Sequence, residues 1–275
     1  MSSDKTVNQE IREQQKQALS TMSFKEKLAY FWDYYKIHTI AVVCGIALVV
    51  SFVRQVAANK PYAFYAMLLN AAVSEENTDI SVIWENEFLE FAGIDSEAYR
   101  VCIDTTLSVS SDGSSQYEMA NRQKLVAMMH AGDIHAIVAD TETFESYAHA
   151  ETFCNLSDIF TKEELAPYAD LLYYTDAAAF DEDSGGTLTE MEAAQKAFYA
   201  MVIDHSDPTA MEKPIAVGIR IPTSGNKMAD AGYYNYLNEG DLSFQGYPSE
   251  TVLGIPLSAK DPKVALQFLS YLNLK

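Results

Sequence analysis

An uninterrupted apolar run near the N-terminus most constrains what this chain can fold into. Residues 37–53 contain no acidic side chain, lysine or arginine, and Lys36 and Arg54 bracket them. Seventeen helical residues rise by about 1.5 Å each and so span roughly 25 Å, near the hydrocarbon thickness of a bilayer. Basic side chains at both ends can reach the lipid headgroups. The run therefore predicts a transmembrane anchor over residues 37–54.

The distribution of basic residues predicts the orientation of this anchor. Six lysines or arginines precede the run, and only Arg54 and Lys60 follow it closely. Because lysine and arginine resist translocation, the N-terminus should stay in the cytoplasm and the C-terminal domain should be extracellular. The expected parts are a cytoplasmic tail (1–36), the anchor (37–54), a stalk (55–61) and an extracytoplasmic domain (62–275).

The tail should end in a juxtamembrane amphipathic helix. Its apolar residues recur at helical intervals, which predicts one apolar face. The residues of this face are Met22, Phe24, Leu28, Phe31 and Tyr35. The helix would lie on the inner leaflet or continue directly into the anchor.

Other interpretations of the apolar run are weaker. A signal peptide could be cleaved after Ala58, but thirty-six residues precede the run and Arg54 falls inside the cleavage region. A lipoprotein signal is disfavoured because Val43 precedes Cys44 deep within the run. A core helix of a soluble protein would not need the charge asymmetry. An uncleaved single-pass anchor fits best.

Charge excludes one large class of partners. The net charge is −20. Residues 1–58 carry seven basic and five acidic side chains, which leaves twelve basic and thirty-four acidic ones, or −22, for the rest. So acidic a surface repels phosphates, and nucleic-acid binding is not expected.

Cysteines are few. Cys44 lies in the apolar run, and Cys102 and Cys154 each sit among apolar residues. Two buried free thiols are the default interpretation, and a single disulfide between them stays open because spacing does not determine pairing.

After the stalk, strand and helix patterns alternate. Strands are expected at 62–69, 99–109, 135–139, 171–174, 215–221 and 251–255, with helices at 79–91, 115–131, 161–168, 189–203 and 262–272. Gly132 and the Asp140-Thr141 pair mark a helix end and a helix start. The order strand–helix–strand–helix–strand predicts parallel pairing with helices on the sheet faces.

Three segments resemble the extracellular solute-binding proteins of ABC importers. They are residues 124–140 (KLVAMMHAGDIHAIVAD), 153–160 (FCNLSDIF) and 254–260 (GIPLSAK) with the helix that follows. Residues 27–40 (KLAYFWDYYKIHTI) resemble anchors of uncharacterised Gram-positive membrane proteins. The resemblance implies an α/β, two-lobed type II solute-binding-protein-like fold, with lobe 1 at about 62–155 and 248–275 and lobe 2 at about 156–247.

The chain departs from that family in two ways. It is shorter than a usual member, which implies a reduced lobe, and it lacks a lipidated cysteine. The resemblance implies capture of a small polar solute and an ABC permease or another envelope protein as partner. The alternative is a structural or interaction module that keeps the fold without transport.

Ligands of open α/β sheets bind beyond the carboxyl ends of parallel strands. Polar side chains there make the candidate ligand site: Asn70, Ser108, Ser110, Asp140, Thr141, Ser224, Asn226 and Tyr233. Each taken alone could equally be a helix cap or a packing residue.

Residues 181–192 (DEDSGGTLTEME) fit a twelve-residue calcium loop. The candidate ligands are Asp181, Asp183, Thr187 and Glu192, with Gly186 at the sharp bend. Gly185 removes one side-chain ligand, so a water would have to replace it. The alternative is an acidic surface turn before a helix.

Catalytic motifs are missing from the sequence. It has no phosphate loop, dinucleotide fingerprint or HExxH motif, and none of its five histidines lies in a base motif. An enzyme is not expected.

Overall fold

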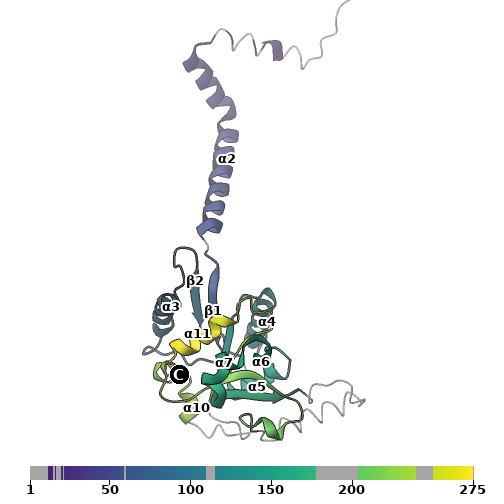
Figure 1. Ribbon diagram of the computed structural model, residues 1–275. Helices are drawn as coiled ribbons and strands as arrows, with labels where there is room; N and C mark the ends of the chain where they lie inside the picture. The colour runs from purple at the N-terminus through teal and green to yellow at the C-terminus, as the bar shows by residue number, and fades with distance from the viewer. Residues whose placement is uncertain are drawn as a thin grey trace, which may run out of the picture. The chain divides into compact units, whose positions relative to one another are not determined.

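The computed structural model describes residues 12–14, 16, 20, 22–58, 60–109, 115–177, 204–239 and 250–274. The chain forms two compact units, Met1–Asn59 and Lys60–Lys275. Figure 1 shows the long helix α2 of the first unit and the sheet and helices of the second, which we call the α/β unit.

Helix α2 (Phe24–Ala58) is continuous over 35 residues. The N–H of Ser23 donates to Glu26 Oε2 at 2.7 Å, and the N–H of Glu26 donates to Ser23 Oγ at 3.4 Å, which supports the first turn. Its segment Tyr35–Val56 is, in the described part of the chain, the one stretch of helix long and apolar enough to cross a membrane. The expected juxtamembrane helix is thus not a separate element, because it continues directly into the apolar run.

Six strands form one mixed sheet in the α/β unit. They are β1 (Tyr62–Leu68), β2 (Arg100–Asp104), β3 (Ala136–Asp140), β4 (Leu172–Asp176), β5 (Pro214–Ile221) and β6 (Thr251–Gly254), in the order β2-β1-β3-β6-β5-β4. β1 pairs in parallel with β2 and β3, which confirms the pairing expected from the alternating pattern. β6 pairs antiparallel with β3 and β5, and β5 pairs antiparallel with β4.

The described residues do not show the two lobes that the resemblance implies. β4 and β5 belong to the expected second lobe, yet they continue the sheet of the first lobe. β6 makes this possible, since it lies between β3 and β5 and hydrogen-bonds to both. Residues Lys60–Lys275 accordingly form one compact unit.

Helices pack on both faces of the sheet. The described helices of the α/β unit are α3 (Ile80–Phe91), α4 (Gln116–Ala131), α5 (Thr141–Ala148), α6 (Leu156–Ile159), α7 (Lys162–Leu165), η1 (Ala166–Leu171), η4 (Pro208–Ala210), α9 (Lys227–Ala231), α10 (Tyr236–Glu239) and α11 (Lys263–Tyr271). Side chains of β1 alternate between two cores. Phe64 packs with Phe88 of α3 and Phe268 of α11, whereas Met67 belongs to the core that contains Phe144 of α5.

Local capping signals predicted several element ends correctly. Ser115 and Glu118 form a capping box before α4, and Gly132 ends that helix with a left-handed φ of 69°. Asp140 caps α5. β2 ends at Asp104, five residues before the predicted strand end at residue 109. The reason is that the Asp104 carboxylate accepts hydrogen bonds from the N–H and hydroxyl of Thr106, which turns the chain. The helix predicted at 189–203 lies outside the described residues.

Both cysteines of the α/β unit are free thiols, so the disulfide that stayed open on sequence grounds is not formed. Burial raises the pKa of Cys102 to about 12 and also raises the pKa of Cys154. Both thiols are therefore protonated and unreactive at neutral pH.

Candidate functional site

The carboxyl ends of the three parallel strands meet at Asn70, directly after β1. Its Nδ2 donates to Asp140 Oδ2 at 3.0 Å and to Thr143 Oγ1 at 2.9 Å. Its Oδ1 accepts from the Val109 N–H at 2.9 Å and from the Ser108 hydroxyl at 3.2 Å. One amide thus joins the end of β1, the loop after β2 and the β3–α5 turn.

The backbone of Asn70 also has an unusual conformation. Its φ is 59°, in the left-handed region that asparagine tolerates better than most residues. Its N–H donates to the Leu107 carbonyl oxygen at 3.1 Å, a second link to the loop after β2. Asparagine therefore suits this position both for its side chain and for its backbone.

A hollow of about 470 Å³ lies beside this junction, at the carboxyl ends of β1 and β2. Its lining residues come from the two loops after these strands and from the first turn of α3. They are Ala71, Val73, Thr78, Ser81, Thr105, Thr106, Leu107 and Ser108. Five of these eight described residues carry a hydroxyl, and none carries a charged side chain. The hollow therefore offers many neutral hydrogen-bonding groups beside a few apolar ones.

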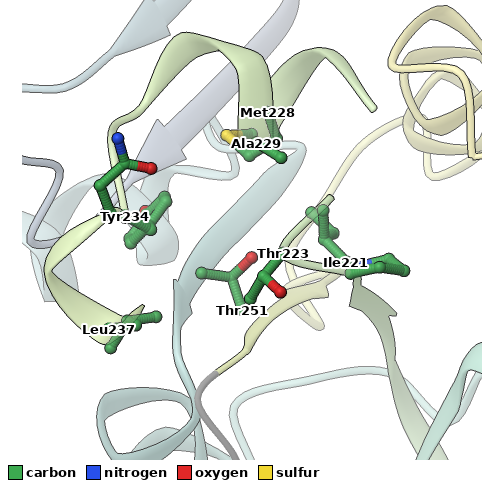
Figure 2. Close-up of a pocket in the computed structure, with 9 residues that line it drawn as sticks. Ile221, Thr223, Met228, Ala229, Tyr234, Leu237 and Thr251 are labelled. Atoms are coloured by element: carbon green, nitrogen blue, oxygen red, sulfur yellow. The ribbon is translucent and has the colours of Figure 1, made fainter. Parts of the chain in front are cut away.

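A second, much smaller cavity lies between β5, β6, α9 and α10. Figure 2 shows Tyr234 and Leu237 across this cavity from Ile221 and Thr251, with Met228 and Ala229 above them. Its volume is about 20 Å³, which is room for one water molecule. It is too small for a solute, so the larger hollow is the better candidate site.

The structure brings together only part of the sequence-predicted ligand set. Asn70, Ser108 and Asp140 meet at the strand ends, and Ser108 also lines the hollow. Ser224 is exposed near the end of β5 and does not line the hollow. Ser110 and the calcium-loop residues Asp181, Asp183, Thr187 and Glu192 lie outside the described residues.

Three predicted ligand residues instead use their polar groups inside the protein. The Thr141 hydroxyl is buried and donates to the Glu250 carbonyl oxygen at 2.9 Å. Asn226 is buried and caps α9, since its Oδ1 accepts from the Ala229 N–H at 3.0 Å. The Tyr233 ring is fully buried, and its hydroxyl donates to the Asn77 carbonyl oxygen at 3.0 Å. These three side chains are occupied by structural contacts, and none of them lines the hollow.

Four hydroxyl-bearing residues of the hollow were not among the predicted ligand residues. Thr105 and Thr106 directly follow the observed end of β2, and Thr78 and Ser81 flank the start of α3. The prediction extended β2 to residue 109 and so placed the two threonines inside a strand. The Asp104-Thr105-Thr106 sequence was the available signal, because aspartate followed two residues later by threonine favours a turn.

Asn70 should be important for the stability of the site. We expect Asn70→Ala to lower the free energy of unfolding of residues 60–275 by about 2–3 kcal/mol, from lost hydrogen bonds and an unfavourable left-handed alanine. Asn70→Gly should recover about 1 kcal/mol of this loss, because glycine adopts positive φ freely. Urea titration measures both values. Asn86→Ala on the exposed face of α3 is the matched control, and an Asn70→Ala stability equal to that of the control would contradict the prediction.

A buried group of titratable side chains lies on the other side of the unit, between α5 and β4. Glu145 is 2% exposed, and its Oε2 accepts from the Tyr173 hydroxyl at 2.5 Å. Its Oε1 lies 2.9 Å from His149 Nε2, and its Oε2 lies 3.8 Å from His205 Nδ1. His205 Nδ1 is also 2.7 Å from the Tyr174 carbonyl oxygen, which can only accept, so this nitrogen carries the hydrogen.

This group, which we call the Glu145 cluster, keeps its carboxylate charged. Burial by itself raises the pKa of Glu145, but the nearby His149 and His205 and the hydrogen bond from the Tyr173 hydroxyl outweigh that effect. The pKa of Glu145 therefore lies below its ordinary value. The cluster is closed to solvent, and no metal-binding set of three or more His, Cys, Asp or Glu occurs in the described part of the chain.

Comparisons with known proteins give limited likenesses. No protein-family model and no curated protein matches the chain. One similar solved structure is an ABC substrate-binding protein from Listeria monocytogenes in complex with cycloalternan, at 12% identity and a TM-score of 0.32, covering 78% of this chain and 75% of that one. Another is iron-bound HitA from Pseudomonas aeruginosa, at 13% identity and a TM-score of 0.30, covering 76% and 80%.

Proposed function

We propose that this chain is a membrane-tethered binding protein that holds a small, polar, uncharged solute in the hollow beside Asn70. The hydroxyl-lined hollow is the observation that carries the proposal. It lies at the carboxyl ends of parallel strands, where open α/β sheets bind ligands. Its hydroxyls can hydrogen-bond a solute, those of Thr106 and Ser108 as acceptors because each already donates within the protein. The lack of a charged lining residue favours a neutral solute.

Helix α2 supports the tether. The segment Tyr35–Val56 has 22 residues, about 33 Å of helix, which matches the hydrocarbon thickness of a bilayer. The excess of basic residues before it favours a cytoplasmic N-terminus and an extracellular α/β unit. An extracellular position would let the hollow meet external solutes and pass them to a permease or another envelope protein.

A thermal-shift screen of residues 60–275 tests solute binding. Sugars, polyols, amino acids and peptides form the panel, with Ca²⁺ alone as a separate arm for the loop at 181–192. A ligand at one hundred times its Kd stabilises the folded state by about 2.7 kcal/mol, so the melting temperature should rise by about 5–10 °C. If no compound in the panel raised the melting temperature, the result would contradict solute binding and favour a structural or interaction module.

Substitutions then test the location of the site. Thr105→Val and Thr78→Val each remove one hydroxyl of the hollow at nearly constant shape. We expect each to reduce the ligand-dependent rise while leaving the melting temperature of the free protein almost unchanged. Thr223→Val, at the small cavity, is the matched control. If the ligand raised the melting temperature equally in all three variants, the ligand would bind elsewhere.

A further inference from the structure

Helix α2 is longer than a membrane crossing requires. Its 35 residues make about 52 Å of helix, whereas a bilayer is about 40–45 Å thick with its headgroups. The extra length lies before Tyr35, at the N-terminal side of the apolar segment Tyr35–Val56. If α2 crosses the membrane, part of the segment from Phe24 to Tyr35 projects into water.

This projecting segment carries an apolar stripe. Phe24, Leu28, Phe31 and Tyr35 recur at intervals of four, three and four residues and are 81%, 60%, 47% and 46% exposed. The Phe31 and Tyr35 rings stack at a centroid distance of 5.4 Å. Alternating steps of three and four residues are the spacing of a coiled-coil contact face, so the stripe suits a second helix.

The same spacing continues through the apolar segment of α2. Further steps of three and four lead to His38, Val42, Gly45, Val49, Phe52 and Val56. We call this line from Phe24 to Val56 the seam. A Cβ built at Gly45 meets no atom within 4 Å beyond the backbone of its own helical turns, so this seam position is open to a neighbouring helix, and glycine allows that helix to approach closely.

We propose that two copies of this chain associate in parallel along the seam of α2. The proposal rests on the membrane crossing proposed above. Copies inserted in the same orientation place identical positions opposite each other across a two-fold axis, so the seam of one faces the seam of the other. In this register Lys27 of one copy lies beside Trp32 of the second copy, an attractive cation–π pairing.

A second copy explains the stripe better than the lipid surface does. To lie flat on the leaflet, the stripe would need a bend between it and the membrane-spanning segment. α2 instead continues from Phe24 to Ala58 without a break. A continuous helix keeps the stripe in the same heptad register as the rest of the seam, so one partner helix can cover both.

Disulfide cross-linking of the full chain in membranes tests the proposal. Single cysteines are introduced in a Cys44→Ser background at two seam positions, Val42→Cys and Val49→Cys. Ile40→Cys and Ala47→Cys, on the opposite side of α2, are the matched controls. Disulfides need Cβ atoms about 4 Å apart, so mild oxidation should give several-fold more dimer from the seam positions.

Any cross-linking result other than an excess of dimer at the seam positions overturns the proposal. Such results are an absence of seam dimers, equal dimer from all four positions, and more dimer from the controls. Gly45→Leu gives a second test, because its added side chain should lower cross-linking through Val42→Cys several-fold, whereas Ala47→Leu should not. Unchanged cross-linking with Gly45→Leu would also overturn it. A chain missing from the membrane fraction contradicts the proposed membrane crossing as well, whereas a membrane-bound chain without seam preference contradicts only the association.

Discussion

Phe144→Ala should lower the free energy of unfolding of residues 60–275 by about 3–5 kcal/mol, the usual cost of truncating a buried phenylalanine. Phe144 is fully buried, stacks on Phe153 at a centroid distance of 4.4 Å with rings 4° from parallel, and meets Tyr173 edge-on at 5.2 Å. Its loss would leave a cavity between α5 and the sheet. Urea titration gives the value, with the exposed Leu257→Ala as the matched control.

The sheet beneath this ring pair contains two glycines. Gly218 of β5 and Gly254 of β6 face each other in register. A Cβ at Gly254 would lie 2.6 Å from Phe153 Cδ1 and 2.7 Å from Phe144 Cε2, closer than real contacts allow. Gly254→Ala should therefore lower the free energy of unfolding by about 1–3 kcal/mol, because the added methyl group overpacks the core.

The two substitutions together test this contact. Phe144→Ala removes one of the rings that the new Cβ would meet, so Gly254→Ala should cost less in that background. The losses in free energy of unfolding of the two single variants, added together, should exceed the loss of the double variant by more than about 0.5 kcal/mol. Strict additivity would contradict the close approach of ring and strand.

Glu145→Ala should lower the free energy of unfolding by about 3–5 kcal/mol at neutral pH, because it removes one partner from a buried, hydrogen-bonded group of side chains. Tyr173 loses the acceptor that its hydroxyl meets at 2.5 Å, and His149 loses its carboxylate partner. Glu145→Gln keeps the shape but not the charge, so it isolates the electrostatic part. Glu142→Gln, one turn earlier on the exposed side of α5, is the matched control.

The pH dependence of the Glu145→Gln effect follows from the pKa of Glu145, which lies below its ordinary value of 4.5. The unfolded state takes up the proton first as the pH falls, so this stabilisation is complete well above pH 4.5 and decreases below it. Urea titrations between pH 7 and pH 4 should show the stability difference between wild type and Glu145→Gln shrinking at the acid end. A difference that does not change with pH would contradict a charged Glu145.

Local signals in the sequence predicted much of the first half of the α/β unit. Ser115, Gly132 and Asp140 mark their helix ends through contacts within a few residues, which is why they can be recognised without a structure. The parallel order of β1, β2 and β3 follows from the helices between them. Asn70 and Asp140 could be predicted at the site because each lies at, or just after, the carboxyl end of a strand.

The position of β6 could not be predicted in the same way. It pairs with β3 and β5. The paired residues of β5 and β6 lie thirty or more positions apart in the sequence, and those of β3 and β6 lie more than one hundred apart. No local pattern encodes such pairing, and the two lobes were implied only by the family resemblance, whereas the described strands form one sheet. Burial is equally non-local, and therefore the use of Tyr233 and Asn226 in structural contacts could not be seen in advance.

The proposed function requires that α2 hold the α/β unit outside the cell membrane, where its hollow would meet solutes. Site-selective labelling with a membrane-impermeant maleimide tests this directly, in a Cys44→Ser background. Leu257→Cys in the α/β unit and Ala29→Cys near the start of α2 both lie at exposed positions. With an extracellular α/β unit, Leu257→Cys should be labelled at once in intact cells and Ala29→Cys only after lysis. Labelling of Ala29→Cys in intact cells, with Leu257→Cys protected, would contradict it.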